Sequence, residues 1–533
     1  MSLFLTRTRF WVFLLLCFVP VAAGAQAKSA AKVVPGKKEA ANRPAHSQMA
    51  AQIEAILAEP EAVRAHWAIS VTTLAGRPVY GHNPGQLGTP ASNTKIFTTT
   101  AAFALLGPNY RFRTTVESTA PIDAQGNITG NLMLIGRGDP NLSGRVLPFD
   151  QKTERTTPSL KALEDMADTL VKAGLKTVSG DLIADDSYFI QERYGAGWSE
   201  DDLMWDYGAP VSALSVNDNQ IFLNILPGTQ TGALAQYTLE PPDTYYVFDN
   251  TLTTAEAKTQ QSIGIDRQPG SKVVALWGSL PIDDKGLSLG LAIEDPAEYA
   301  GIAFRRMLEA RGVVIQGQTH EQHARPQDFA PPEVNPLGGP SLPIVPPVPS
   351  PTVAYLLAEH QSNPLSDDLR VINKASQNLH AELLLRTLGR HEAGSGSIEG
   401  GAAVVRKFLE DVGIPDEAFV FYDGSGVSRQ NLVTPEAVTT LLCYAARQPW
   451  AAQFRDTLPL AGVDGTLSER FKHTPLQGKV QAKTGTLTGA SALSGYVQTQ
   501  RGRWLAFSIL VDDHQIPKVR TFIDRIVTAI GQE

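Results

Sequence analysis

The sequence predicts an α+β fold in which both ends of the chain build one antiparallel sheet and the middle of the chain is inserted between them. The flanking stretches carry the β-branched and aromatic residues that strands favour, separated by short turns such as Ala75-Gly76. A chain of 533 residues is longer than one core usually supports, so we expect two or more domains. The strand-like stretches are 66–73, 78–82, 479–486, 492–499 and 503–511.

Helices are expected to cover this sheet. Residues 47–58 place Met49, Ile53, Ile56 and Leu57 on one face and end at Pro60. A second helix, 92–106, follows Pro90 and ends at Gly107-Pro108. The last helix begins near Pro517 and repeats apolar residues at i, i+3, i+4 and i+7.

The middle of the chain predicts a separate β-rich part. Five strand-like stretches, 128–134, 178–184, 220–226, 272–276 and 287–293, alternate there with helical patterns at 159–173 and 297–311. We therefore expect a discontinuous catalytic domain, an inserted β-rich region of one or more domains that carries no reacting group, and a proline-rich connection without regular structure. The expected boundaries are 47–112 with 352–533, then 113–325, and 326–351.

The N-terminus predicts export. Arg7 and Arg9 precede an apolar run, and Ala25-Gln26-Ala27 offers a cleavage site, so residues 1–27 are interpreted as a signal peptide. A membrane anchor is the weaker alternative, because the run is shorter than the roughly 20 residues of a spanning helix. Residues 28–46 form a basic, alanine-rich leader, expected to be a flexible tether. We expect a soluble periplasmic or cell-envelope protein.

The composition excludes several classes of partner and cofactor. The formal net charge of −8 argues against nucleic acid, which binds clustered Lys and Arg. Export would leave Cys443 as the one cysteine, so no intramolecular disulfide is possible. The ten histidines lack metal-site spacing, and no glycine-rich phosphate loop is present, so no metal or cofactor is expected.

Three short motifs stand in one order along the chain. They are Ser92-Asn93-Thr94-Lys95, Ser376-Gln377-Asn378 and Lys483-Thr484-Gly485, the last followed by Thr486. Together they supply a nucleophile with a nearby amine, a hydroxyl-amide pair and a second cation, which are the parts of serine acyl transfer without histidine.

Each motif has a structural alternative. Ser92 and Ser376 stand where a serine can cap a helix, and a lysine in a strand is ordinarily solvated. Chance matches also occur, at Ser29 to Lys32 and at Ser215-Val216-Asn217. Ser92 differs from Ser29 because it opens a helix apolar enough to be buried, which places Lys95 on the same face one turn later. The ordered triple therefore favours catalysis.

The triple, together with four further stretches, resembles the penicillin-recognising serine acyl-transferases. The chain is most similar to class C low-molecular-mass penicillin-binding proteins, which are D-alanyl-D-alanine carboxypeptidases or endopeptidases. The likeness covers about residue 47 to the C-terminus, and the family's long insertion distinguishes it from compact β-lactamases. The further stretches are Gly136 to Pro140, Tyr207 to Asn219, Tyr422 to Gly426 and Gly462 to Leu467.

This resemblance implies a fold and a set of roles. The fold is a five-stranded antiparallel sheet with helices on both faces plus a helical cluster. Ser92 would form the acyl-enzyme, and Lys95, made neutral by burial and by the charge of Lys483, would take its proton. Ser376 would relay that proton to the leaving amine, and Asn378 would hold Lys95 and the substrate amide.

The strand motif would complete the site. Lys483, Thr484 and Thr486 would bind the terminal carboxylate, and Gly485 would let the strand approach closely. The backbone N–H groups of Ser92 and Thr486 would form the oxyanion hole.

The resemblance predicts peptidoglycan stem peptides and β-lactams as ligands. A serine β-lactamase and a non-hydrolytic wall-binding or β-lactam-sensing protein remain the alternatives. Neither the preference between carboxypeptidase and endopeptidase activity nor the oligomeric state follows from the sequence.

Overall fold

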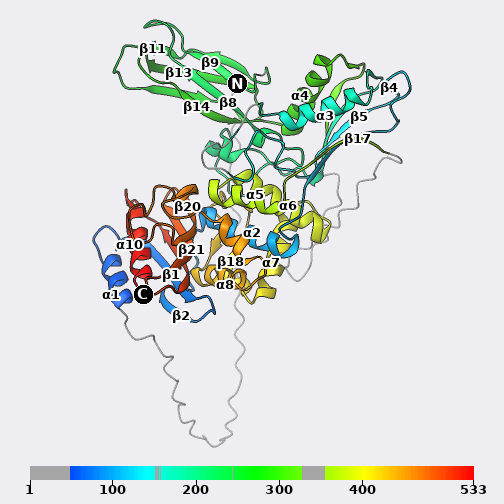
Figure 1. The fold of residues 1–533 in the computed structure, drawn as a ribbon. Helices are drawn as coiled ribbons and strands as arrows, with labels where there is room; N and C mark the ends of the chain where they lie inside the picture. Colours follow the sequence, from blue (N-terminus) through cyan, green and yellow to red (C-terminus); the bar gives the residue numbers. More distant parts are fainter. Residues whose placement is uncertain (1–47, 150–154, 156–157, 243, 327–353) are drawn as a thin grey trace, which may run out of the picture. The chain divides into compact units, whose positions relative to one another are not determined.

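The computed structural model describes residues 48–149, 155, 158–242, 244–326 and 354–533 (Figure 1). The expected signal peptide (1–27) and leader (28–46) lie outside the described residues, as does nearly all of the proline-rich connection (326–351).

One five-stranded antiparallel sheet joins the two ends of the described chain, as the sequence predicts. Its strand order is β2-β1-β22-β21-β20, so β1 pairs on one side with β2 and on the other with β22. The register places His66 opposite Asp512 and Lys483 opposite Ser494. The strands are β1 His66–Thr73, β2 Pro78–His82, β20 Val480–Leu487, β21 Ala490–Gln498 and β22 Trp504–Asp512.

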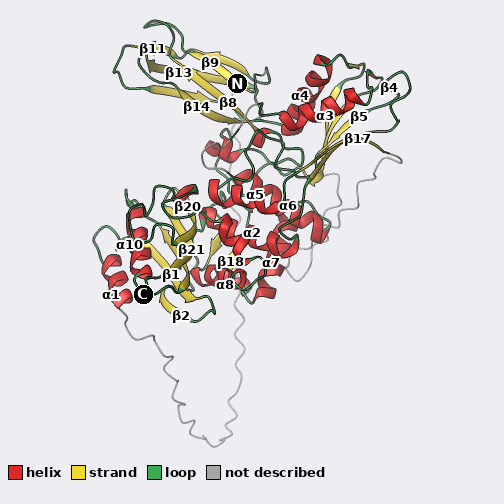
Figure 2. Cartoon of the chain, viewed as in Figure 1, coloured by secondary structure: helices red, strands yellow, loops and turns green. Residues whose placement is uncertain are grey.

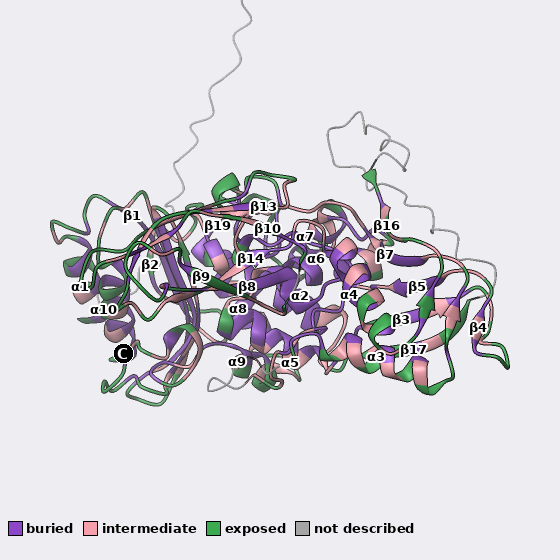
Figure 3. Cartoon of the chain, turned by 90° about the horizontal axis from the view of Figure 1, so that it is seen from above, coloured by how far each residue is buried: buried purple, intermediate pink, exposed green. Residues whose placement is uncertain are grey.

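Helices cover both faces of this sheet (Figure 2). On one face, α1 (Gln48–Leu57) packs against α10 (Val519–Gly531), and their apolar residues share a core with inward side chains of the strands. On the other face lies α8 (Pro435–Ala445), which contacts β1 and β22. β21 and β22 are buried along almost their whole length, because helices cover both faces of the sheet. Figure 3 shows α8 mostly in the colour of buried residues.

A helical cluster adjoins that second face. The first of its helices is preceded by a 3₁₀ turn, Ala91–Asn93, where the sequence predicted one continuous helix over 92–106. The third begins just after Ser376, which was expected to stand where a serine can cap a helix. A short hairpin of β18 (Phe419–Val420) and β19 (Leu432–Val433) completes the cluster. The helices are α2 Thr94–Leu105, α5 Leu365–Arg370, α6 Asn378–Ala393, α7 Ile398–Val412, α8 and α9 Ala451–Thr457.

The segment between the first two motifs is β-rich. One sheet has the order β16-β7-β5-β3-β17, and its last strand comes from residues that follow the proline-rich connection. Two helices, α3 (Lys161–Lys172) and α4 (Pro296–Ala310), share a core with this sheet. The strands are β3 Arg113–Ser118, β5 Leu132–Ile135, β7 Leu182–Ile190, β16 Thr319–Ala324 and β17 Tyr355–Gln361.

The remaining strands of this segment form three smaller sheets, ordered β15-β6-β4, β14-β8-β9 and β10-β13-β11 with β12 beside β13. Two stretches predicted as single strands, 128–134 and 178–184, are each divided in two, because Gly130 and Gly180 lie at the breaks. The bounds are β4 Asn127–Ile128, β6 Thr177–Val178, β8 Gln220–Leu226, β9 Gln236–Glu240, β10 Val247–Asn250, β11 Thr253–Ala255, β12 Ser262–Asp266, β13 Val273–Pro281, β14 Leu287–Ala292 and β15 Val314–Ile315.

Candidate active site

Ser92 lies in the 3₁₀ turn at the entrance to α2. The residue before it, Ala91, has a positive φ of 45°, which is uncommon for a residue with a side chain. Gly426 packs closely against this turn. A Cβ atom at position 426 would lie 1.8 Å from the Ala91 carbonyl oxygen, so a side chain there would clash with the turn. The turn also attaches to the sheet, because the Asn93 amide donates to Ser494 Oγ at 2.7 Å. Ser92 is thus held on a constrained turn between sheet and helices.

Lys95 is completely buried one turn after Ser92. Its Nζ contacts Ser92 Oγ at 2.9 Å and donates to Asn378 Oδ1 and the Ser425 carbonyl oxygen, both at 2.6 Å. A neutral amine has two N–H donors and one lone pair. Those donors match Asn378 and Ser425, which leaves the lone pair for the proton of Ser92.

Burial lowers the pKa of Lys95 to about 7, although the negative charges of Asp423 and Glu382 act in the opposite direction. Burial and the charge of Lys95 together hold the pKa of Lys483 well below its usual value. The sequence assigned part of the lowering at Lys95 to Lys483. In the structure, burial lowers the pKa of Lys95. The repulsion between the two amines instead contributes to the lowered pKa of Lys483.

Ser376 ends a turn of π-helix, Val371–Ala375, and adopts the left-handed conformation with φ 61°. Such turns and strained residues often occur at functional sites. Lys483 Nζ, which is also fully buried, donates to Ser376 Oγ at 2.8 Å and to the Thr484 carbonyl oxygen at 2.9 Å. The second and third motifs are therefore in direct contact.

Asn378 is the first residue of α6 and faces two ways. Its Oδ1 accepts from Lys95, while its Nδ2 donates to the Tyr207 carbonyl oxygen at 2.7 Å. Its neighbour Gln377 donates through Nε2 to Asp218 Oδ2 at 3.2 Å. Tyr207 and Asp218 belong to the segment that we expected to carry no reacting group. The structure shows that this segment nevertheless contacts the second motif.

A buried ionic network lies beneath Asn378. His380 contacts Asp368 at 2.7 Å and Asp218 at 3.2 Å, and these carboxylates raise its pKa to about 9 against the opposing effect of burial. Arg145 and Arg155 also bind Asp218, and together these cations hold the pKa of this fully buried carboxyl well below its usual value. Asp218 lies in one of the stretches that carry the family resemblance, but no role was predicted for it or for the other residues of this network.

The chance match Ser215-Val216-Asn217 belongs to the turn that contains Asp218. Ser215 Oγ donates to the Ser212 carbonyl oxygen at 2.8 Å, and Asn217 Nδ2 donates to the Gln220 carbonyl oxygen at 2.8 Å. Both side chains are buried in these local contacts. The other chance match, Ser29 to Lys32, lies outside the described residues.

A second buried pair holds the loop beside Lys95. Glu382 Oε1 accepts from the backbone N–H groups of Gly424 and Ser425, each at 2.9 Å, and its Oε2 accepts from Arg386 at 2.9 Å. The loop therefore presents the Ser425 carbonyl to Lys95. The sequence signal was available, since Glu382 and Arg386 are opposite charges four residues apart inside an apolar helix.

The strand motif forms one wall of the site. A Cβ atom on Gly485 would lie 2.4 Å from the Pro90 carbonyl oxygen, so only glycine lets β20 approach the turn of Ser92 this closely. The neighbouring Thr484 hydroxyl is hydrogen-bonded to Thr466 Oγ1 at 2.8 Å.

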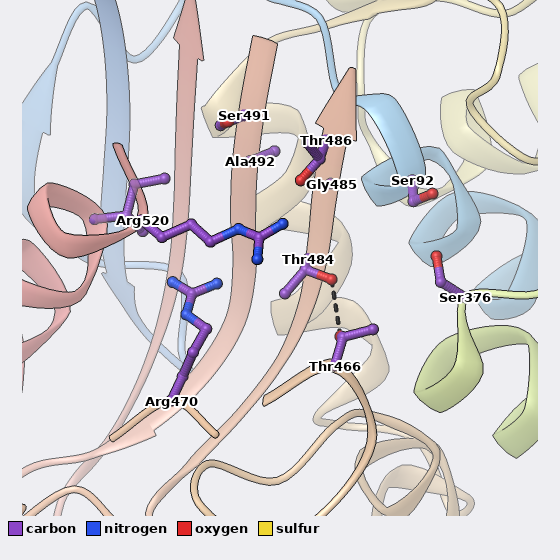
Figure 4. A pocket seen from close by; sticks show the side chains of 11 residues that line it. Ser92, Ser376, Thr466, Arg470, Thr484, Gly485, Thr486, Ser491, Ala492 and Arg520 are labelled. Atoms are coloured by element: carbon purple, nitrogen blue, oxygen red, sulfur yellow. Dashed lines mark hydrogen bonds between the residues drawn. The ribbon is translucent and has the colours of Figure 1, made fainter. Parts of the chain in front are cut away.

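A cleft of about 370 Å³ lies between these elements (Figure 4). Ser92 and Ser376 lie at one end, and Thr484 and Thr486 lie along the middle. The lining residues are Ser92, Ser376, Thr466, Arg470, Thr484, Gly485, Thr486, Ser491, Ala492, Arg520 and Ile523. The structure thus brings together all eight predicted site residues, with Lys95 and Lys483 buried behind this lining and Asn378 half-buried beside Lys95.

This arrangement defines a class of enzyme. A serine hydroxyl is hydrogen-bonded to a buried lysine of lowered pKa, and a second serine-lysine pair lies beside it. These groups are equipped for nucleophilic acyl transfer without a histidine. The fold places this chemistry between a five-stranded antiparallel sheet and a helical cluster.

Comparison with known proteins agrees with that class. The model of the D-Ala-D-Ala carboxypeptidase 3 (S13) family matches residues 49–331 and 346–531, so the chain belongs to this family. It is a serine hydrolase of the D-Ala-D-Ala carboxypeptidase type, and the resemblance to penicillin-binding proteins is confirmed.

Two relatives and one solved structure illustrate the likeness. A D-alanyl-D-alanine carboxypeptidase of Actinomadura sp. (strain R39) is 34% identical over 91% of this chain and 85% of its own length. The carboxypeptidase DacB of Haemophilus influenzae is 30% identical over 78% of this chain and 79% of its own. The crystal structure of penicillin binding protein 4 (dacB) from H. influenzae matches with a TM-score of 0.74 and 25% identity, covering 90% of this chain and 99% of that one.

No helix within the described ranges is long and apolar enough to cross a membrane.

Proposed function

We propose that this enzyme removes the terminal D-alanine from peptidoglycan stem peptides through an acyl-enzyme on Ser92. The observation that supports this proposal best is the 2.9 Å contact between Ser92 Oγ and the buried Nζ of Lys95, whose pKa is lowered to about 7. An amine with that pKa is largely neutral at pH 7.5 to 8 and can accept the serine proton.

In acylation, Ser92 Oγ attacks the carbonyl carbon between the two D-alanines while its proton passes to Lys95. The backbone N–H groups of Ser92 and Thr486, both at the cleft, stabilise the negative charge on the former carbonyl oxygen. The C–N bond then breaks, leaving an ester on Ser92.

The leaving amine needs a proton, and Ser376 provides the hydroxyl of the second motif. Lys483 donates to Ser376 Oγ at 2.8 Å, while Asn378 joins the amine of Lys95 to the same loop. A proton that left Ser92 reaches the amine of D-alanine through Lys95 and Ser376. Water then attacks the ester by the same route in reverse, which frees the shortened peptide and restores Ser92.

Recognition of the terminal carboxylate is assigned to the strand motif. Thr484 and Thr486 line the cleft, and Lys483 lies buried behind them. Penicillins carry a carboxylate in the corresponding position, so we propose that they acylate the same serine. The proposed division into a catalytic domain (47–112 and 352–533) and an inserted region (113–325), and the export of the protein, rest on the sequence patterns.

The test is an assay of the purified protein on a pentapeptide stem and on intact peptidoglycan, with muropeptides separated by mass. We expect release of D-alanine and lasting labelling by a fluorescent penicillin. Cleavage of cross-linked muropeptides would add endopeptidase activity. Rapid turnover of penicillin would identify a β-lactamase, and labelling without any change in the muropeptides would identify a non-hydrolytic binder.

A further inference from the structure

The cleft continues past the strand motif and ends at two guanidinium groups. Arg470, from the segment before β20, and Arg520, from the first turn of α10, line the same cleft as Ser92 and Thr484. Figure 4 shows Thr484 and Thr486 between the two serines and the two arginines. The Arg520 guanidinium reaches toward Thr484, and the Arg470 guanidinium lies beside the Arg520 side chain. None of the proposed catalytic steps uses these arginines.

The two arginines differ in their partners. Arg470 Nε donates to Asp524 Oδ1 at 3.0 Å, so one carboxylate holds its guanidinium in place. The exposed Arg520 makes no hydrogen bond or ion pair with any residue that the structure describes. Asp524 interacts electrostatically with both arginines, and two guanidinium charges beside this one carboxylate leave this end of the cleft with a net positive charge.

The geometry points to a second anion-binding subsite for the leaving group. The terminal carboxylate of the leaving residue is already assigned to Thr484 and Thr486, which lie nearer Ser92. A group that reaches Arg520 must therefore come from the side chain or extension of the leaving residue. Guanidinium groups bind carboxylates through charge-assisted hydrogen bonds, often two at once.

We propose that Arg520, beside the anchored Arg470, selects leaving groups that carry a second carboxylate. This inference rests on the proposed function, because it describes the leaving-group side of the same site. A leaving residue with an acidic extension is what a cross-linked stem presents, whereas a free pentapeptide releases only D-alanine. The arginines would thus favour cleavage of substrates whose leaving group is itself part of another acidic stem.

The experiment compares peptides with one acyl part and different leaving residues. D-Glu is compared with D-Gln, and D-2-aminopimelate is compared with its side-chain amide. Within each pair only the side-chain charge differs, and the two pairs place that charge at two different distances from the scissile bond. D-Ala is the reference. We expect the unmodified enzyme to release the acid of at least one pair about 10-fold more efficiently, in kcat/KM, than its amide. Arg520→Gln should remove that preference while changing the D-Ala reaction less than about 2-fold.

Two further variants separate charge from structure. Arg520→Lys should keep part of the preference, because the charge remains without the planar fork. Arg525→Gln is the matched control, since Arg525 lies on the same helix but pairs with Glu59 away from the cleft, and it should keep the full preference.

The outcomes distinguish this inference from the proposed function. Equal release of acid and amide in both pairs, with D-Ala still released, would overturn the arginine subsite and leave the carboxypeptidase assignment intact. A preference that survives in Arg520→Gln would also overturn it. If none of the peptides is cleaved by a protein that still labels with penicillin, the proposed function fails and the subsite fails with it.

Discussion

His380 Nε2 lies 3.2 Å from Asp218 Oδ1, and this contact joins the helix that begins with Asn378 to the segment inserted between the first two motifs. Both residues are completely buried. Because Gln377 contacts the same carboxylate, Asp218 supports one residue directly before Asn378 and another two positions after it. The inserted segment therefore helps to position the second motif, although it supplies none of the proposed reacting groups.

Replacing Asp218 tests this positioning role. Asp218→Asn leaves Arg145, Arg155 and His380 without their common carboxylate, and breaking a buried ion pair usually costs about 3–5 kcal/mol. We expect the free energy of unfolding in urea to fall by that order. In the protein that remains folded, penicillin acylation should slow, because Ser376 and Asn378 lose their support. Asp266→Asn, at the exposed end of strand β12, is the control. A stable, fully reactive Asp218→Asn protein would contradict the role.

Ser92→Ala should abolish both D-alanine release and covalent penicillin labelling while leaving the fold intact, because no other residue of the triple can form the ester. Mass spectrometry of the penicillin-treated protein measures the adduct, and circular dichroism checks the fold. Ser491→Ala, which removes another hydroxyl that lines the cleft, should still label. An adduct on Ser92→Ala would show that the nucleophile is assigned wrongly.

The rate of acylation should rise with pH. The pKa of Lys95 is lowered to about 7, and only its neutral form takes the proton of Ser92. The second-order rate constant for penicillin should therefore be small at pH 5.5, increase through about pH 7 and level off above it. Lys95→Arg, which stays charged throughout this range, should be inactive at every pH. A rate that stays flat or falls over the same range would exclude Lys95 as the base.

Thr484→Val tests recognition of the carboxylate. This change keeps the shape of the side chain and removes the hydroxyl, so the strand should remain folded. We expect acylation efficiency to fall by about 1.5–3 kcal/mol for substrate and penicillin alike, the range for a hydrogen bond to a charged group. Thr484→Ser, which restores the hydroxyl, should recover most of this loss. If Thr484→Val acylates at the unmodified rate, the carboxylate is held elsewhere.

Local patterns predicted much of the fold. The five strands of the main sheet and helices α1 and α10 carry strong period-2, continuous apolar or 3.6-residue patterns, and all are found within a few residues of the expected bounds. The three motifs also meet as predicted, because each is a short run of residues whose order along the chain is informative by itself.

Contacts between distant residues could not be predicted in this way. Asp218 and His380 are single charged residues in separate segments, and nothing local marks them as partners. Pairing of β17 with β3 likewise depends on tertiary structure, since β17 is an ordinary strand-like run after the proline-rich connection. The 3₁₀ turn at Ser92 was missed because its residues are compatible with a continuous α-helix.

The pairing of β1 with β22 has a consequence for how the enzyme comes into being. β1 belongs to the first strands made during synthesis, yet its partner is completed only at Asp512. Until then β1 and β2 form a lone hairpin, which is marginal in water. The turn of Ser92 also lacks its neighbour β20. A chain that ends before these last strands would lack both the partner of β1 and the strand beside Ser92, so we expect it to have no working nucleophile.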